Sequence, residues 1–194
     1  MSTLIIARQL FLFGHLIAFA IAISEVARGD IQLLRSGIDA GRLRVGTDII
    51  LWSLATLWLT GFALIFLEVS FDFEALLHRP KILAKLIVVA ILSLNGILLH
   101  RLAFPLLTGE TKRSHRAIVI CSILGAISTA SWLYAAFVGA ARFIGGFLTL
   151  GTFLALYATV LIGAIAIALV FVRPLLERHW APAPAPAPAE TVVG

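Results

Sequence analysis

Costly polar residues stand inside one long apolar stretch of the chain. Residues 80–105 read PKILAKLIVVAILSLNGILLHRLAFP, and this stretch contains Lys85, Ser93, Asn95 and His100. Each of these side chains is unfavourable in contact with lipid unless a partner faces it. On a helix, Lys85, Ser93 and His100 fall within a sector of about 80°, and Asn95 lies on the opposite flank of Lys85. These residues therefore either bond to neighbouring helices as packing contacts or line a functional site.

A histidine lies near the middle of the first apolar segment, at His15. Neutral imidazole tolerates apolar surroundings better than a charge does, and it can accept a proton or bind a metal. His15 and His100 together would be candidate axial ligands of a b-type haem. At 1.5 Å per residue, however, His100 lies roughly 10 Å further inward unless the helices tilt strongly. The alternatives are His15 as the sole metal ligand, His15 as a proton acceptor opposite Asn95, and a purely structural buried histidine that bonds to a neighbouring hydroxyl.

Hydroxyl side chains occur at the same expected depth in the other apolar segments. The residues of this midplane layer are Thr56, Thr60, Ser128, Thr129 and Thr159. Transporters place their binding sites near the bilayer midplane, which favours a functional layer. Hydroxyl groups in helices also bond to their own backbone four residues back, which favours a purely structural layer.

A second set of ionisable residues is expected near one membrane surface. Its members are Glu25, Asp48, Arg101 and His115, and His100 is expected at a similar depth. Ion pairing among them is the simple interpretation, and proton relay is the sharper one.

The elements that must position these residues are membrane-spanning helices. The chain has 194 residues, of which 61% are hydrophobic and 13% charged, and its mean hydropathy is +1.06. Such a composition is typical of an integral membrane protein. We predict an all-α polytopic bundle of five transmembrane helices, at about 4–26, 48–68, 82–104, 116–138 and 149–172. Together, residues 1–176 would form the transmembrane domain.

Two further segments flank or connect the spans. Between the first two spans, Asp30 is a plausible N-cap and apolar residues follow it at helical spacing, which predicts a short interfacial helix. Residues 177–194 contain APAPAPAPA and predict an extended Ala/Pro-rich cytoplasmic tail.

The basic residues predict the orientation of the protein. Ten of the 15 Lys and Arg residues fall on the side of the first and third loops and the tail. By the positive-inside rule this side is cytoplasmic, so we expect a bacterial-type inner membrane with the N-terminus outside. The net charge of +5 is dispersed at the ends of apolar segments, which does not suggest a nucleic-acid partner. The first span loosely mimics a secretory signal, but its apolar run continues past the cleavage-like triplet, which favours retention.

Small residues indicate where helices approach closely. Gly151, Ala155, Thr159 and Gly163 recur at four-residue steps, so this face contacts either the fourth span or a second copy in a homodimer. The fourth span carries a similar small-residue face and is expected at the centre of the bundle. Its single cysteine, Cys121, excludes an internal disulfide, and motifs of hydrolases, zinc proteases and nucleotide-binding enzymes are absent from the sequence.

The first three spans resemble the small bacterial membrane proteins grouped around the HemJ-type protoporphyrinogen oxidase and the CopD-like copper-resistance proteins. The resemblance rests on GHLIAFAIA around His15, a basic interhelical segment and PKILAKL around Lys85, and it covers about half of the chain. It implies a haem or porphyrin role for His15 and Lys85. Asn95 stands where that oxidase carries a histidine.

Three functions fit this sequence. The first is a redox-linked role with a haem or metal cofactor near His15, with Lys85, Asn95 and His100 as further cofactor-binding candidates. The second is a small-solute or ion permease with a polar site at the midplane. The third is an accessory subunit of a membrane complex, without chemistry of its own.

Overall fold

The protein is a bundle of long antiparallel helices. The structure is a computed structural model and describes residues 2–35, 40–70, 72–107, 115–141 and 147–179. Every regular element in these ranges is helical. In chain order the elements are α1 (Ser2–Leu34), α2 (Ala40–Val69), α3 (Phe73–Leu77), α4 (Pro80–Leu98), η1 (Leu99–Ala103), α5 (Phe104–Leu107), α6 (His115–Ala140), α7 (Leu150–Ile167), η2 (Ala168–Val172) and α8 (Arg173–His179).

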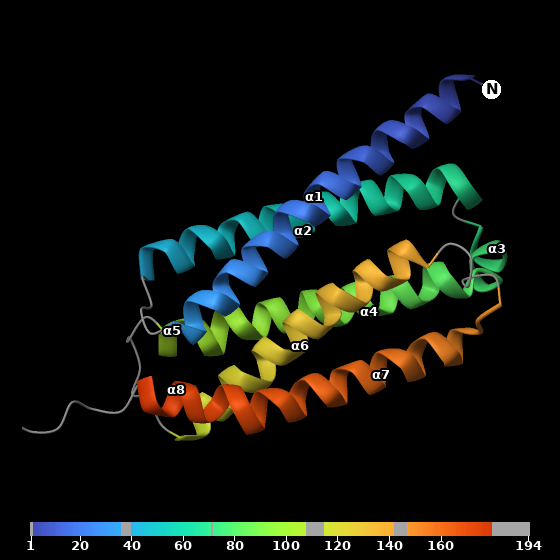
Figure 1. Cartoon of the computed structure of the whole chain (residues 1–194). Coiled ribbons are helices and arrows are strands. Elements are labelled where there is room, and N and C mark those ends of the chain that lie inside the picture. The colour runs from blue at the N-terminus through green and yellow to red at the C-terminus, as the bar shows by residue number, and fades with distance from the viewer. Residues whose placement is uncertain (1, 36–39, 71, 108–114, 142–146, 180–194) are drawn as a thin grey trace, which may run out of the picture.

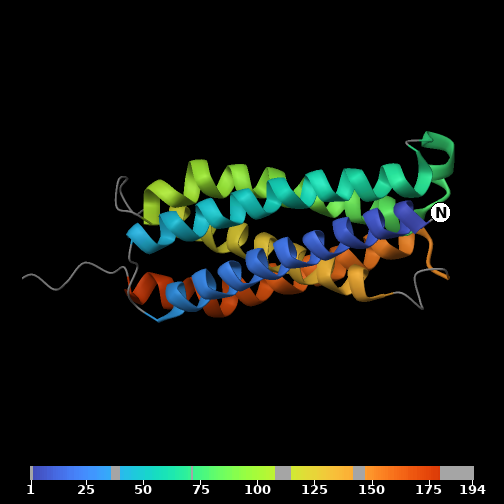
Figure 2. The ribbon, with the colours of Figure 1, turned by 90° about the horizontal axis from the view of Figure 1, so that it is seen from above.

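Five helices are long and apolar enough to cross a membrane, which confirms the predicted number of spans. In Figure 1 they run alternately in opposite directions, and α1 crosses obliquely over α2. The N-terminus and α3 lie at one end of the bundle, which we call the α3 end. The last turn of α1, the start of α2, α5 and α8 lie at the other, the α8 end (Figures 1 and 2). The protein is therefore an integral membrane protein.

α6 is the central helix of the bundle. Half of its most apolar stretch is buried by other helices, against 11–22% for the other four spans. It contacts α1, α4, α7 and α8. Its small residues allow this close approach, as the sequence predicted, because they let several backbones come near one helix.

Proline explains two wide turns in the spanning helices. Pro105 and Pro174 each follow a single π-helical turn, η1 and η2 respectively. A proline in a helix lacks the N–H of its turn and its ring clashes with the carbonyl four residues earlier. Widening the preceding turn relieves this clash, so both helices continue past their prolines.

The connections between spans differ from the prediction in two places. α1 continues through Gly29 and Asp30 to Leu34, and α2 already begins at Ala40. The described residues therefore form no separate interfacial helix: Asp30 lies inside α1, where its side chain has a partner on α6, and is not an N-cap. At the other terminus the helix runs through Pro174 to His179, so it extends beyond the expected boundary at 176. Residues 180–194 of the expected tail lie outside the described residues.

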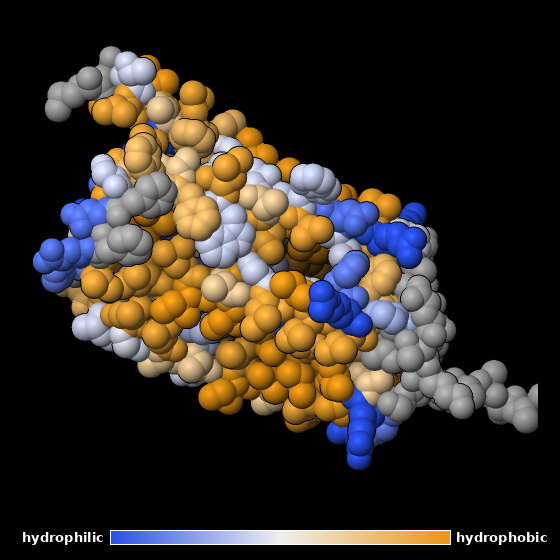
Figure 3. All heavy atoms as spheres, turned by 180° about the vertical axis from the view of Figure 1, so that it is seen from behind, coloured by the Kyte–Doolittle hydropathy of each residue, from blue (hydrophilic) through white to orange (hydrophobic). Residues whose placement is uncertain are grey.

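The surface of the bundle fits contact with lipid. Figure 3 shows hydrophobic residues over most of the middle of one face, and hydrophilic residues gathered towards the two ends. Large apolar side chains such as Leu59, Leu133 and Ile162 are exposed along the spans. Since a bilayer solvates such side chains, their exposure is expected for membrane-spanning helices.

Candidate functional site

His15 lies against α2, held by a threonine. Its Nδ1 is 2.8 Å from Oγ1 of Thr60. The hydroxyl of Thr60 donates its own hydrogen to the carbonyl of Thr56 at 2.7 Å, as hydroxyls in helices commonly do. Thr60 Oγ1 must then accept from His15, so the neutral imidazole carries its proton on Nδ1. Nε2 is left as the basic nitrogen, with a lone pair for a proton or another ligand.

A glycine makes room for this imidazole. A Cβ atom built on Gly61 would lie 3.7 Å from Cε1 of His15, at van der Waals distance. The ring of His15 therefore packs over the backbone of α2. A larger side chain at position 61 would push the ring away from Thr60.

Lys85 comes from α4 and faces the same region as His15. Leu92, seven residues further along α4, belongs to the same apolar cluster as Ala18 of α1 and Leu57 of α2. Residues seven apart share a helix face, so Lys85 points towards α1 and α2 as well. Lys85 is half-buried. We call His15, Thr60 and Lys85 the His15 group.

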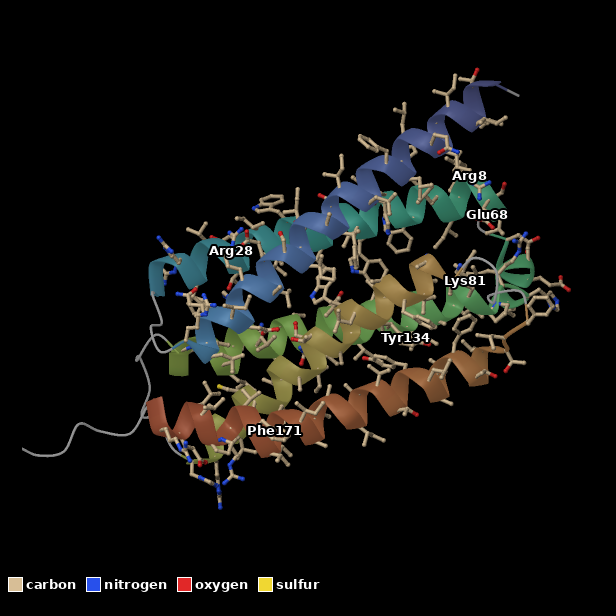
Figure 4. All side chains as sticks on the ribbon, viewed as in Figure 1. Arg8, Arg28, Glu68, Lys81, Tyr134 and Phe171 are labelled. Carbon is tan, nitrogen blue, oxygen red and sulfur yellow. The ribbon has the colours of Figure 1, made fainter. Side chains whose placement is uncertain are left out.

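A cluster of charges lies at the α3 end of the bundle. Glu68 pairs with Arg8 at 3.4 Å and with Arg79 at 3.1 Å. Lys81 donates to the carbonyl of Ala141 at 2.9 Å. Figure 4 shows Arg8, Glu68 and Lys81 at this same end of the bundle. A small surface hollow beside Arg8 is lined by Leu4, Ile5, Arg8 and Leu67.

Asp30 forms a second, half-buried group, which sequence reasoning missed. Its Oδ2 accepts a hydrogen bond of 2.7 Å from the hydroxyl of Thr129. Thr129 is close to the middle of α6, and Asp30 lies in the first span, four residues before the end of α1. The missed signal is the four-residue spacing of Ala18, Ala22, Val26 and Asp30, of which the first three are buried. Gly29-Asp30 also fits a helix start, and this second pattern conceals the continuing stripe.

Asn95 is buried and only half satisfied. Its side chain is 3% exposed, and its Nδ2 donates to the carbonyl of Leu124 at 3.0 Å. Its Oδ1 has no hydrogen-bond partner among the described residues. A buried acceptor without a partner costs about 1–3 kcal/mol, so this atom is either a source of instability or a binding position.

The remaining midplane hydroxyls do not join these groups. Thr56 and Thr159 are exposed and donate to the backbone carbonyls of Trp52 and Ala155. Ser128 is half-buried on α6. A further polar contact, from the indole of Trp58 to Ser93 at 3.0 Å, joins α2 to α4. The predicted midplane layer is therefore not continuous. Thr60 bonds to His15 and Thr129 bonds to Asp30, whereas Thr56 and Thr159 bond only to their own helices.

The expected cytoplasmic cluster separates into different contacts. Glu25 pairs with Arg28 at 2.7 Å on its own helix. Asp48 and Arg101 are exposed. His115 instead contacts Glu177 of α8 at 3.0 Å, and Arg173 bonds to both of them. These last three residues tie the start of α6 to α8, and they form the ion cluster of the α8 end.

A bis-histidine haem does not fit the described residues. Trp58 on α2 is level with Ser93 on α4, so His15, which bonds Thr60, is level with about residue 91. His100 then lies roughly 13 Å further along the bundle at 1.5 Å per residue. It is exposed, and its ring stacks near that of Phe104 at 5.6 Å. Within the described ranges, no three His, Cys, Asp or Glu side chains come together as metal ligands would.

No protein-family model, curated protein or solved structure matches this chain. The resemblance to HemJ-type oxidases and CopD-like proteins therefore stays a prediction.

Proposed function

We propose that the protein is a proton-linked permease of the bacterial inner membrane. Protons would pass through the interior of the bundle, together with a small solute, by way of the Asp30 and His15 groups. The site residues all come from α1, α2, α4 and α6, the helices that meet around Trp132 and its apolar neighbours.

The observation that carries this proposal is the carboxylate of Asp30. It lies inside a membrane span, bonded to one neutral hydroxyl, and among the described residues it has no basic counter-ion. A carboxylate kept only for packing would need a cation or several donors, because an unpaired charge in this environment is costly. An acid that binds and releases a proton avoids this cost in its neutral form. Intramembrane acids of this kind commonly serve proton and ion transport.

His15 supports the same function from another depth. On α1, His15 and Asp30 are fifteen residues apart and so lie within about 60° of each other on the helix surface. Each is held by a threonine of a neighbouring helix. In both groups one position remains for a proton, Nε2 of His15 and the carboxylate of Asp30. Both groups can therefore change charge without breaking the packing around them.

The other two functions have less support. A cofactor would have His15 Nε2 as its ligand, with Thr60 orienting the ring as partners of metal-bound histidines do. Within the described residues His15 belongs to no group of three or more His, Cys, Asp or Glu side chains that could hold a metal ion. The accessory-subunit function is favoured by the stripe Gly151, Ala155, Thr159 and Gly163, which is exposed on α7 and available to a partner helix. We propose a homodimer through this face, compatible with transport by each protomer.

The orientation proposed is the one the basic residues favour. The end of α1 and the start of α2, which lie at the α8 end, carry Arg28, Arg42 and Arg44, and Arg35 follows α1 directly; η1, the start of α6 and α8 at the same end carry Arg101, Arg116, Arg173 and Arg178. By the positive-inside rule the α8 end would face the cytoplasm, and the N-terminus the outside. A cysteine-accessibility experiment on Ser2→Cys and Arg178→Cys would test this, because only one of the two should react from outside.

The function is tested in proteoliposomes loaded with a pH-sensitive dye. An imposed pH gradient, with the membrane potential clamped, should collapse faster with the wild-type protein than in empty vesicles. Asp30→Asn should abolish this effect, whereas Asp48→Asn, which changes an exposed aspartate, should not. Equal rates with Asp30→Asn and wild type would exclude the proposal. A Soret band in the purified protein that is lost in His15→Ala would favour the cofactor function instead.

A further inference from the structure

The ion cluster of the α8 end closes a ring of contacts between α6 and α8. His115 Nδ1 lies 3.0 Å from Oε1 of Glu177, and His115 Nε2 lies 3.1 Å from Nη2 of Arg173. Arg173 also donates from its Nε to the same Glu177 oxygen at 2.9 Å. Arg173 and Glu177 both belong to α8. His115 therefore makes both of the contacts in this ring that join α6 to α8.

The ring requires a neutral imidazole at His115. A guanidinium only donates hydrogen bonds, so His115 Nε2 must accept the bond from Arg173. The single proton of the neutral imidazole then lies on Nδ1 and is donated to Glu177. A second proton, on Nε2, would set one N–H donor against another and place a positive imidazole beside the guanidinium. The bond from Arg173 to His115 can therefore exist only while His115 is neutral.

The charges around the cluster do not favour a second proton. Near this end α1, η1 and η2 contact α6 or α8. Besides the cluster itself, the described residues in the last part of α1, in η1, at the start of α6 and in α8 include these charged or titratable side chains: Glu25, Arg28, Asp30, His100, Arg101, Arg116 and Arg178. The two carboxylates among them have partners of their own, Arg28 and Thr129. A protonated His115 thus gives the cluster a net positive charge among mostly basic neighbours.

α8 has a second contact that does not depend on charge. It follows η2 directly, and its Leu176 is only 3% exposed. This apolar contact holds α8 on the bundle whatever the charge of His115. Loss of the bond from Arg173 should therefore loosen α8 against α6 without detaching it, with movement about the wide turn η2.

We propose that His115 is a pH-sensitive latch, which holds α8 against the start of α6 while its imidazole is neutral and releases Arg173 when the imidazole binds a proton. Histidine is the side chain that ordinarily changes charge between about pH 5 and 8. The side chain of His115 is 64% exposed, so a proton can reach it from water. The latch is closed at the upper end of this range and opens as the pH falls. It does not depend on the proposed function.

The test measures the distance between α6 and α8 in the full-length protein in mild detergent. Spin labels are attached to Ile120→Cys and Leu175→Cys, which change exposed apolar residues and leave every charge in place. Cys121→Ala removes the native thiol. Pulsed electron paramagnetic resonance should find a narrow distance distribution at about pH 8 and a broader or longer one at about pH 5.5, on either side of the usual histidine titration.

Matched variants of His115 separate its charge from its size. His115→Gln has a neutral donor and an acceptor in one side chain, so the distribution should stay narrow at both pH values. His115→Lys has a positive charge and no acceptor, so the broad distribution should already be present at about pH 8. His100→Gln changes an exposed histidine of η1 and should leave the pH response as in the wild type.

Three outcomes would overturn the latch. They are a wild-type distance that is the same at both pH values, a pH response that persists in His115→Gln, and a pH response that is lost in His100→Gln. If His115→Lys does not fold, the His115→Gln result still decides, because that variant keeps the neutral contacts. Proton flux does not enter this measurement, so failure of the latch would leave the proposed permease standing.

Discussion

α4 separates two interfaces of opposite character. On one side its Ala84 and Val88 are fully buried against Val138 of α6 and Phe153 of α7. On the neighbouring side Lys85 is half-buried and shares the helix face of Leu92, which packs with residues of α1 and α2. The first interface is apolar and closely packed, and the second holds ionisable groups. A single helix thus contributes both to the rigid core and to the candidate site.

The polar atoms of the two interfaces differ in the same way. Between α6 and α7, the hydroxyl of Tyr134 donates to the carbonyl of Phe153. The hydroxyl of Tyr157 is 2.8 Å from that of Ser131, which also donates to its own helix. All of these groups are neutral and have partners. Around α1, Asp30 and His15 have one hydroxyl each, and Lys85 has no direct partner among the described residues. The packed, fully partnered groups thus belong to one interface, and the ionisable groups with few partners belong to the other.

The substitution Asp30→Asn should have the largest effect on proton flux, and it tests whether the interface around α1 differs in role from the one between α6 and α7. The amide keeps the shape of the carboxylate and can still accept from Thr129, so the fold should be retained. It cannot take up a proton, so the proton flux should fall by at least about tenfold. The matched measurement is the unfolding temperature, which should stay close to wild type. Loss of folding together with flux would mean that Asp30 is structural.

Phe153→Ala should produce the largest loss of stability in the other interface. The side chain is fully buried at 0% exposure, and its removal leaves a cavity. In a bilayer the unfolded side chain is also in apolar surroundings, so mainly the cavity part of the penalty remains, about 2 kcal/mol. Phe171→Ala, at an exposed position (Figure 4), is the control. Reversible unfolding in mixed micelles measures both, and equal effects would contradict the packing described.

Tyr157→Phe removes one hydroxyl contact and little else. The loss should be about 0.6 kcal/mol, the average of interhelical hydrogen bonds in membranes. Thr159→Val, two residues further along α7, removes an exposed hydroxyl that bonds only to its own helix. The same unfolding measurement should find that variant close to wild type. A larger loss for Thr159 than for Tyr157 would place the important contact on the outer face of α7.

Gly61→Ala should have the smallest effect, and it sharpens the description of the His15 group. The added methyl group would lie at 3.7 Å from the imidazole, an ordinary contact, so stability should change by less than about 0.5 kcal/mol. Gly61→Leu should instead displace the ring from Thr60 and reduce proton flux. Undiminished flux in Gly61→Leu would show that the position of His15 does not matter for transport.

Much of the fold follows from the sequence, because membrane thickness constrains it. Apolar length gives the five spans, and small residues gave the central place of α6 correctly. The end of α1 could not be placed in this way, since Gly29-Asp30 fits both a helix start and a continuing helix. What decides is Thr129, which is ninety-nine positions away in the chain and offers Asp30 a hydrogen bond.

The sequence predicts which residues belong to the candidate site better than it predicts which of them contact one another. His15, Lys85, Asn95 and Thr60 stand out by residue type inside apolar segments. Which of them meet depends on helix tilt and rotation, and these are set by packing against neighbours. The oblique course of α1 brings His15 to Thr60 and Asp30 to Thr129, whereas helices drawn upright place His15 opposite Asn95. For the same reason the expected ion cluster separates, with His115 meeting Glu177.

The two π-helical turns give the bundle an asymmetry along its length. η1 and η2 both contact α6, and both lie near the α8 end, directly before a proline. At each of them the backbone hydrogen bonds span five residues instead of four, as from Phe104 to Leu99 and from Arg173 to Ala168, and such turns are a common cause of kinks in long helices. The central helix α6 is therefore flanked by two π-helical turns near the α8 end, whereas α4 and α7 are regular α-helices towards the α3 end. Rocking of the bundle would therefore open the α8 end first.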